Sequence, residues 1–340
     1  MHSIDLNERP AIIVWEMTRA CRLACVHCRA RSQTSRHPEE LTADEGRHLL
    51  DTIAASRPAL LILTGGDPSR RDDLLPLIAH ARDAGLRVAF SPSTTPDLLA
   101  LDFDALRDAG VSRVSVSLDG ATSATHNAFR GVARAWDWAM QTIGKLRAAR
   151  LPFQINSSIS ARNIAEFPAL AEQVRSLAPA GWTIFLVVPT GRAEYEHLPT
   201  SEAVERLWLD LLAFARDVPF DVRTTEGQHY RRVVAQNLDG GRALSVPPGI
   251  NDGKGFMFIS HIGEIAPSGF LPLVAGNVRH DDLVTTYRDT PVFRELRNAD
   301  LLKGKCGCCE FRNLCGGSRA RAYGLTGDYL ASDPLCAWQP

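Results

Sequence analysis

Apolar residues alternate between strand-like and helix-like spacing through the first half of the chain. Six short runs are aliphatic or β-branched without polar alternation, which is typical of parallel strands covered on both faces. Amphipathic helix patterns lie between them, and the first begins with a capping-box signature from Thr42 to Glu45. Such successive βα units predict an α/β fold with a parallel, right-handed partial barrel or open sheet of six units rather than a full TIM barrel. The six runs are Ile12–Glu16, Leu60–Thr64, Arg87–Ser91, Arg113–Leu118, Phe153–Ser158 and Thr183–Val188.

The pattern changes after Pro189. A helical pattern at Ser201–Asp217 is followed by a less regular stretch rich in Gly and Pro. Met257–Ile265 is typical of a hairpin with Gly263 at its turn, and a short helix is expected from Arg294–Asn298. We therefore expect two domains: the partial barrel in residues 1–219 and a smaller domain in residues 220–340.

Composition and charge argue against several classes of protein. The 38 Lys and Arg and 39 Asp and Glu are mixed along the chain, so there is no global electrostatic case for a nucleic-acid or membrane partner. The first residues lack the basic start and apolar stretch of a signal peptide. No uninterrupted apolar run reaches the ~18–20 residues that a membrane span needs. We expect a soluble cytoplasmic protein.

The eight cysteines fall into two groups. Cys21, Cys25 and Cys28 form a C-x3-C-x2-C motif after the first strand run, and the other five lie between residues 306 and 336. A secreted disulfide framework would be denser, so the cysteines indicate metal or cluster ligands in a reducing compartment. Three thiolates are one short of what a [4Fe–4S] cluster needs, which would leave one iron open to a small molecule. Buried free thiols or a zinc ribbon remain the alternatives.

The C-x3-C-x2-C motif resembles that of the radical S-adenosylmethionine superfamily. Gly65-Gly66-Asp67-Pro68 is similar to its GGE-type motif, which receives the methionine amino group, with Asp in place of Glu. Ser117-Leu118-Asp119-Gly120 resembles its SLDG segment, and the resemblance makes Arg130 a partner for the methionine carboxylate. It implies a cluster on Cys21, Cys25 and Cys28, with cofactor contacts at C-terminal strand ends. The implied contacts are His27, Gly65, Gly66, Asp67, Ser117, Asp119, Arg130, Asn156 and Pro189.

The second cysteine group resembles the SPASM/twitch extensions of radical enzymes, in the shorter form. Cys306, Cys309, Cys315 and Cys336 match its spacing, which implies one auxiliary [4Fe–4S] cluster with four protein ligands. Such a closed cluster is suited to electron transfer. Cys308, the fifth cysteine of this group, is not expected to be a ligand. Ser268 and Arg319 stand near where a fuller SPASM pattern would have further cysteines, which argues against a second auxiliary cluster.

Four segments of the sequence resemble one branch of the superfamily, the haem-pathway radical enzymes. The chain also resembles the cytosylglucuronic acid decarboxylase of blasticidin-type biosynthesis. The resemblance implies a 5′-deoxyadenosyl radical that removes hydrogen near a carboxylate, followed by decarboxylation, and an external one-electron donor such as a flavodoxin or ferredoxin. Cytosylglucuronic acid is the first candidate substrate and a tetrapyrrole propionate the second, because only 7% of residues are aromatic. The segments are Trp15–Cys21, Leu63–Pro68, Thr224–Arg232 and Cys315–Arg321.

Basic and polar residues of the second half are candidates for binding or protonating the substrate, although each could equally form an ordinary ion pair. Two other functions stay open. A peptide maturase shares the architecture, but it commonly has a leader-binding domain before the barrel, and the first strand run begins at Ile12. A non-catalytic iron–sulfur carrier or zinc-stapled module would explain the cysteines but not the strand-end motifs. The candidates are Arg192, Glu226, His229, Tyr230, Arg231, Arg232, Lys254, Arg319 and Arg321.

Overall fold

The computed structural model describes residues 4–237 and 249–340. In this part of the chain one sheet of ten strands has the order β10-β9-β8-β1-β2-β3-β4-β5-β6-β7. Strands β1 to β7 are parallel and neighbours in chain order, β8 joins β1 in parallel, and β9 and β10 are antiparallel additions. The strands are β1 (Ile12–Glu16), β2 (Leu60–Thr64), β3 (Val88–Phe90), β4 (Val111–Ser117), β5 (Phe153–Ile159), β6 (Gly181–Leu186), β7 (Asp221–Thr225), β8 (Phe256–Ile259), β9 (Glu264–Ala266) and β10 (Gly276–Asn277).

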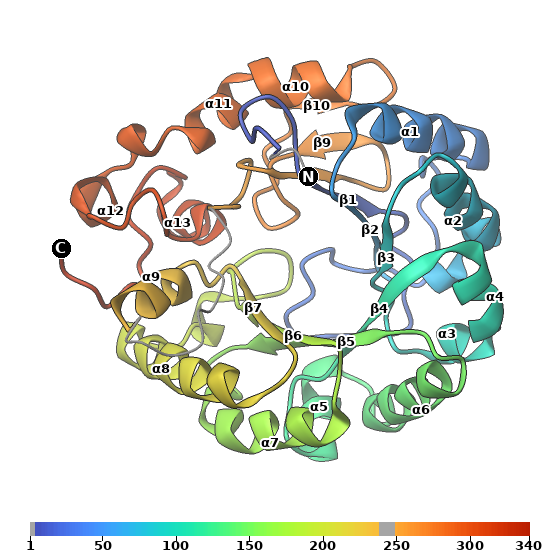
Figure 1. The fold of residues 1–340 in the computed structure, drawn as a ribbon, viewed down its shortest axis with the longest axis horizontal. Coiled ribbons are helices and arrows are strands. Elements are labelled where there is room, and N and C mark those ends of the chain that lie inside the picture. The colour runs from blue at the N-terminus through green and yellow to red at the C-terminus, as the bar shows by residue number, and fades with distance from the viewer. Residues whose placement is uncertain (1–3, 238–248) are drawn as a thin grey trace.

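Helices form a ring around the outside of the curved sheet (Figure 1). The predicted capping box is confirmed: the side chain of Thr42 accepts from the backbone of Glu45, and that of Glu45 from the backbone of Thr42. No helix of the described residues is long and apolar enough to cross a membrane. The helices are α1 (Ala43–Ser56), α2 (Leu74–Asp83), α3 (Pro96–Ala100), α4 (Phe103–Ala109), α5 (Ser123–Arg130), α6 (Ala135–Ala148), α7 (Phe167–Leu177), α8 (Ser201–Asp217), α9 (His229–Gln236), α10 (Leu283–Asp289), α11 (Pro291–Arg297), α12 (Gly304–Cys308) and α13 (Arg319–Thr326).

The strands have two apolar faces. Ile13 and Trp15 of β1 point outward and pack in the main core with the helices. Val14, between them, belongs to a separate apolar cluster on the inner face, because successive strand residues point to opposite sides. We call five residues of this cluster the inner apolar wall. They are Ile12, Val14, Ile62, Phe256 and Phe258.

The predicted partial barrel is confirmed, with two more parallel strands, β7 and β8, than the six expected. The additional strand β7 was missed because its sequence, Asp221–Thr225, is polar and only partly buried. The predicted hairpin is present as β8 and β9. The sheet is continuous across the expected boundary at residues 219 and 220, since β7 pairs with β6 and β8 with β1. The division into residues 1–219 and 220–340 stays a prediction.

Candidate active site

The first three cysteines lie on the loop that follows β1. Cys21 and Cys25 are buried and Cys28 is partly exposed, and all three are free thiols that pack with Leu23, Val132 and Trp138. Each sulfur has a nitrogen donor: Leu23 N lies 3.3 Å from that of Cys21, Ser32 N 3.4 Å from that of Cys28, and Arg130 Nη1 3.8 Å from that of Cys25. Donors directed at sulfur stabilise thiolate ligands, so this loop fits a sulfur-ligated cluster.

Burial disfavours free thiolates on this loop. It raises the pKa of Cys21 to about 11 and also raises that of Cys25. Both groups are therefore protonated at neutral pH unless a positive charge compensates them, and bound iron would supply that charge.

Arg192 and Gly191, which follow β6, hold the cysteine loop. Arg192 donates from its backbone N to Cys28 O at 2.9 Å and from Nε to Cys25 O at 3.0 Å. Gly191 has a φ of +65°, and a Cβ there would lie 2.3 Å from Cys28 O. Arg192, expected on the substrate side, thus has its guanidinium turned toward the loop backbone.

The two glycines after β2 let a second loop approach the first. Gly66 N donates to Thr18 O at 2.7 Å, and a Cβ on Gly66 would lie 2.6 Å from Arg19 O. A Cβ on Gly65 would lie 2.5 Å from Thr18 O. Any side chain at these positions would therefore push the loops apart.

Asp67, next in the same motif, is fully buried. Its carboxylate accepts from Ser69 N at 3.1 Å, from Ser69 Oγ at 2.5 Å, and from the hydroxyl of Thr95. Burial raises its pKa to about 6 even though these donors act to lower it. Asp67 is thus an acceptor that changes charge close to neutral pH.

Asp119, which follows β4, and Arg130, at the end of α5, form a buried pair beside the cysteine loop. Arg130 Nε lies 2.5 Å from Asp119 Oδ2. Burial acts to raise the pKa of Asp119, but the Arg130 guanidinium holds it below the usual range. His126 Nδ1 accepts from Asp119 N at 3.1 Å, and burial lowers the pKa of this imidazole to about 4. The structure pairs Asp119 with Arg130, and the cofactor contacts that the resemblance implies for each stay predictions.

The remaining predicted cofactor residues lie on the loop after β1, on β4 and β5, and after β6. The His27 ring packs on Phe129, with centroids 4.4 Å apart, and burial lowers its pKa to about 3, so the ring is neutral. Ser117 and Asn156 are register partners on β4 and β5, and both are partly exposed. Pro189 follows β6 and contacts α13, since a Cβ on Gly324 would lie 3.0 Å from Pro189 Cγ. Their cofactor contacts stay predictions.

The second cysteine group surrounds a small cavity near the C-terminal end. Cys306, Cys309, Cys315 and Cys336 all line it, with His229 and Arg232 of α9, Lys305 and Arg312 also present. Burial raises the pKa of Cys315 to about 12, so thiolate ligands would need compensating charge here too. Cys308 is exposed and is not part of the lining. The shared cavity supports the four-ligand assignment.

Neither cysteine group, in the described part of the chain, is arranged around a single metal ion. Within residues 4–237 and 249–340, no three His, Cys, Asp or Glu side chains are arranged to hold one ion. A four-iron cube spaces its ligands more widely than one ion does.

Arg319 and Arg321, expected as substrate-side cations, are buried and bind the C-terminal segment. Arg319 donates from Nη1 to Tyr329 O at 2.9 Å and to Ala331 O at 2.7 Å. Arg321 donates to Asp333 Oδ2 at 2.8 Å, to Val187 O at 3.2 Å, and to the backbone oxygen of Glu226. Their guanidiniums thus join the barrel to the second cysteine group.

Glu226, His229 and Tyr230 also lie at this junction. Glu226 accepts from the Ser318 hydroxyl, and its pKa is raised well above the usual range by burial and then by the neighbouring Asp252. His229 Nε2 lies 2.9 Å from an oxygen of Asp333. Tyr230 packs on Trp208, with ring centroids 5.9 Å apart.

The other candidates are Arg231, Arg232 and Lys254. Arg231 Nη2 donates to Ile250 O at 2.5 Å, and Arg232 Nη1 binds Glu205 at 2.9 Å. Lys254 is partly buried, which lowers its pKa. Substrate contacts of all these residues stay predictions.

Sequence reasoning missed an ion cluster around Glu16, the last residue of β1. Glu16 is fully buried, with Arg29 Nη2 2.7 Å from Oε2, and with Arg19 Nε 3.2 Å and His261 Nδ1 3.0 Å from Oε1. Burial acts to raise its pKa, but Arg29 and then His261 and Arg19 lower it to about 2. The only signal in the sequence was a lone acid at the end of an apolar strand.

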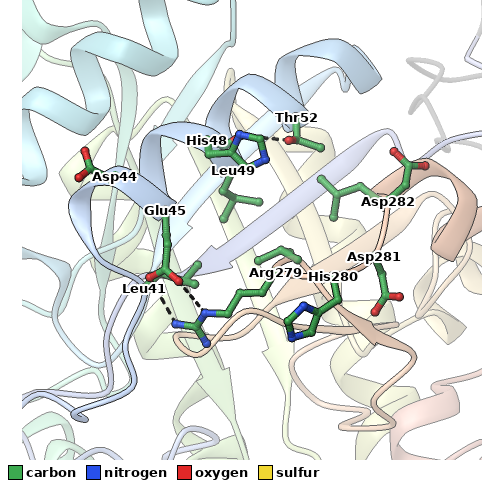
Figure 2. A pocket seen from close by; sticks show the side chains of 12 residues that line it. Leu41, Asp44, Glu45, His48, Leu49, Thr52, Arg279, His280, Asp281 and Asp282 are labelled. Atoms are coloured by element: carbon green, nitrogen blue, oxygen red, sulfur yellow. Dashed lines mark hydrogen bonds and ion pairs between the residues drawn. The ribbon is translucent and has the colours of Figure 1, made fainter.

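A larger cavity, of about 650 Å³, lies elsewhere (Figure 2). This cavity lies on the helix side of the sheet, between α1 and residues 278–283. Arg279 binds Glu45 at 2.7 Å across it. Its lining contains none of the predicted site residues.

Comparison with known proteins agrees with this geometry. The family model described as the Radical SAM superfamily matches residues 15–174. The AdoMet-dependent heme synthase of Methanosarcina barkeri (strain Fusaro / DSM 804) is 38% identical over 349 residues, covering 99% of each chain. The enzyme of the same name from Nitratidesulfovibrio vulgaris (strain Hildenborough) is 38% identical over 342 residues, covering 97% of this chain and 92% of that protein. Streptococcus suis SuiB, solved with its precursor peptide SuiA, has a TM-score of 0.76 at 16% identity, covering 97% of this chain and 76% of that one, and shares the fold.

The predicted superfamily and its cofactor pair are confirmed, while the individual ligands stay predictions. With 38% identity to a relative over almost the whole of both chains, this protein belongs to the radical SAM superfamily, in the branch of the haem-pathway enzymes, and it uses S-adenosylmethionine with a [4Fe–4S] cluster.

Proposed function

We propose that this enzyme makes heme by oxidative decarboxylation of propionate side chains on an iron tetrapyrrole. The observation that carries the proposal is the 38% identity to curated heme synthases over nearly full length. Heme has two vinyl groups and two propionates. If each vinyl group arises from a propionate, the substrate is a tetrapyrrole with four propionates, such as iron coproporphyrin III. This reverses the order of the two substrate candidates drawn from the sequence.

Conversion of a propionate side chain to a vinyl group is an oxidation. A propionate side chain loses one hydrogen atom from the carbon next to the ring, then carbon dioxide and one electron, and becomes a vinyl group. When bound, the first cluster and S-adenosylmethionine supply the 5′-deoxyadenosyl radical that removes the hydrogen atom. Cys306, Cys309, Cys315 and Cys336 would hold an auxiliary cluster, whose one-electron chemistry would take up the electron that the side chain releases. An external one-electron donor is required for each turnover.

The chain's own residues keep the reacting groups dry and in place. Arg192 and Gly191 fix the cysteine loop from the end of β6, and Gly65 and Gly66 fix it from the end of β2. The neutral ring of His27 packs on Phe129 beside the loop and excludes water there.

The inner apolar wall favours the tetrapyrrole over the sugar nucleoside. Its five side chains are aliphatic or aromatic and lie on the strand face opposite the helices, on β1, β2 and β8. A flat apolar macrocycle can bury the remaining exposed area of Ile12, Ile62 and Phe256, whereas a sugar nucleoside needs polar groups that the wall lacks.

The test is anaerobic turnover with reductant and S-adenosylmethionine. Iron coproporphyrin III should yield products lighter by carbon dioxide plus two hydrogens for each vinyl group, together with 5′-deoxyadenosine. Cytosylglucuronic acid and a leader-bearing peptide are supplied in parallel. Robust 5′-deoxyadenosine formation with either of these, and none with the tetrapyrrole, would overturn the proposal.

A further inference from the structure

We propose that Arg29 binds a carboxylate of the substrate and that Glu16 positions its guanidinium for this contact. The inference rests on the proposed function and assigns the residue that recognises the propionate.

Arg29 lies where the cysteine loop meets the inner apolar wall. It directly follows Cys28, and its guanidinium carbon stands 4.7 Å from the centre of the Phe258 ring. Phe258 belongs to the wall, together with Val14. A macrocycle packed on this wall would therefore have a cation at its edge, next to the loop that binds the first cluster.

The backbone at Gly269 also lies close to the guanidinium. A Cβ at this position would lie 2.9 Å from the guanidinium carbon of Arg29, closer than carbon atoms approach without a shift. Gly269 O accepts from Arg29 Nη1, but at a long 3.4 Å. The backbone at Gly269 thus leaves just enough space for the side chain of Arg29 and binds it weakly.

Arg29 retains hydrogen-bonding capacity that a fully used guanidinium, such as that of Arg321, lacks. Arg321 is fully buried and donates from Nε, Nη1 and Nη2 to three separate acceptors. The Arg29 side chain is 18% exposed, and its one short contact in the described structure is the 2.7 Å bond to Glu16. A guanidinium has five N–H groups, so a carboxylate can still be bound.

The net charge of the ion cluster around Glu16 also favours binding of an anion. The single carboxylate of Glu16 faces two guanidiniums, those of Arg19 and Arg29, and the ring of His261. One positive charge therefore remains uncompensated within the group, and a propionate would neutralise it. Glu16 itself is fully buried and does not reach the substrate, so its role is to orient Arg29.

The test compares a tetrapyrrole acid with its ester. Holoprotein is titrated anaerobically with iron coproporphyrin III and with its tetramethyl ester, and absorbance gives both dissociation constants. Arg29→Gln should weaken binding of the acid about ten- to a hundredfold and leave that of the ester unchanged. Arg29→Lys keeps a point charge, so its dissociation constant for the acid should lie between those of the wild type and Arg29→Gln. It serves as the test variant if the Arg29→Gln protein does not load iron. Arg22→Gln is the matched control, because Arg22 is exposed on the same loop and pairs with Asp97.

Glu16→Gln tests the positioning role through the ratio of the two dissociation constants. A general loosening of the site would weaken acid and ester alike, whereas misplacement of Arg29 should weaken only the acid. Acid binding unchanged in Arg29→Gln, or acid and ester weakened equally, would overturn the inference and leave the proposed function standing. A wild-type protein that binds neither tetrapyrrole would contradict both.

Discussion

Arg130 binds Asp119 through two nitrogens, since Nε and Nη2 each lie 2.5 Å from the same carboxylate oxygen. Both residues are buried, and Arg130 Nη1 also reaches the sulfur of Cys25 at 3.8 Å. The pair therefore connects the end of β4 to the cysteine loop. Because each charge is out of water, each depends on the other for stability.

The first prediction concerns this pair. Arg130→Met leaves the Asp119 carboxylate buried without its cation, and the free energy of unfolding should fall by about 3–5 kcal/mol. The double variant Asp119→Asn/Arg130→Met removes both charges and should recover a large part of this loss. Anaerobic urea unfolding of proteins matched for iron content measures the difference. A single variant as stable as the wild type would show that the pair contributes nothing.

The second prediction is two [4Fe–4S] clusters per chain. Replacing Cys21, Cys25 and Cys28 with Ala should leave about half of the iron and abolish 5′-deoxyadenosine formation, because only the three-cysteine cluster has an open iron. Cys308→Ala should retain both clusters, since Cys308 is exposed and outside the cavity of the other four cysteines. Iron and acid-labile sulfide analysis measures both outcomes. Full iron loading of the triple variant would refute the ligand assignment.

Local patterns in the sequence identified most of the strands and the motifs at their ends. The aliphatic runs located β1 and β2, and the C-x3-C-x2-C and Gly65-Gly66-Asp67 motifs are each contained in one loop. Contacts between distant segments gave no such signal. Glu16 and His261 are 245 residues apart in the sequence, and they meet only because β8 pairs in parallel with β1.

The basic residues near the second cysteine group show the same limit. In the sequence, Arg319 and Arg321 are charged residues close to Cys315, which made them candidates for binding the substrate. In the structure the C-terminal segment turns back, and its carbonyl groups at Tyr329 and Ala331 accept from Arg319. Buried carbonyl groups need donors, and which donors meet them is decided by the fold.

The third prediction concerns Gly191. A Cβ at this position would lie 2.3 Å from Cys28 O, and the φ of +65° is strained for any residue with a side chain. Gly191→Ala should displace the cysteine loop, cost about 1–3 kcal/mol and lower the iron of the first cluster. Gly144→Ala is the control, because Gly144 lies in α6 with open space around it and should gain up to about 1 kcal/mol. Equal iron content in the two variants would contradict the close approach.

The last prediction is a pH dependence of cofactor binding through Asp67. Burial raises its pKa to about 6, so the group is a carboxylate above that pH and carries a proton below it. If Asp67 accepts from the methionine ammonium, protonation removes the acceptor, and affinity for S-adenosylmethionine should fall as pH falls. Between roughly pH 7.5 and pH 5.5 the ionised fraction drops about fourfold, and the affinity should follow it.

Substitution separates this effect from other titrating groups. Asp67→Asn should bind S-adenosylmethionine about ten- to a hundredfold more weakly at neutral pH, and without the slope, since the amide does not titrate. Asp83→Asn changes an exposed carboxylate that pairs with Arg82, and it should keep the wild-type profile. The change in the cluster's electron paramagnetic resonance spectrum on cofactor addition reports binding at each pH. An Asp67→Asn protein with wild-type affinity and slope would remove Asp67 from the cofactor site.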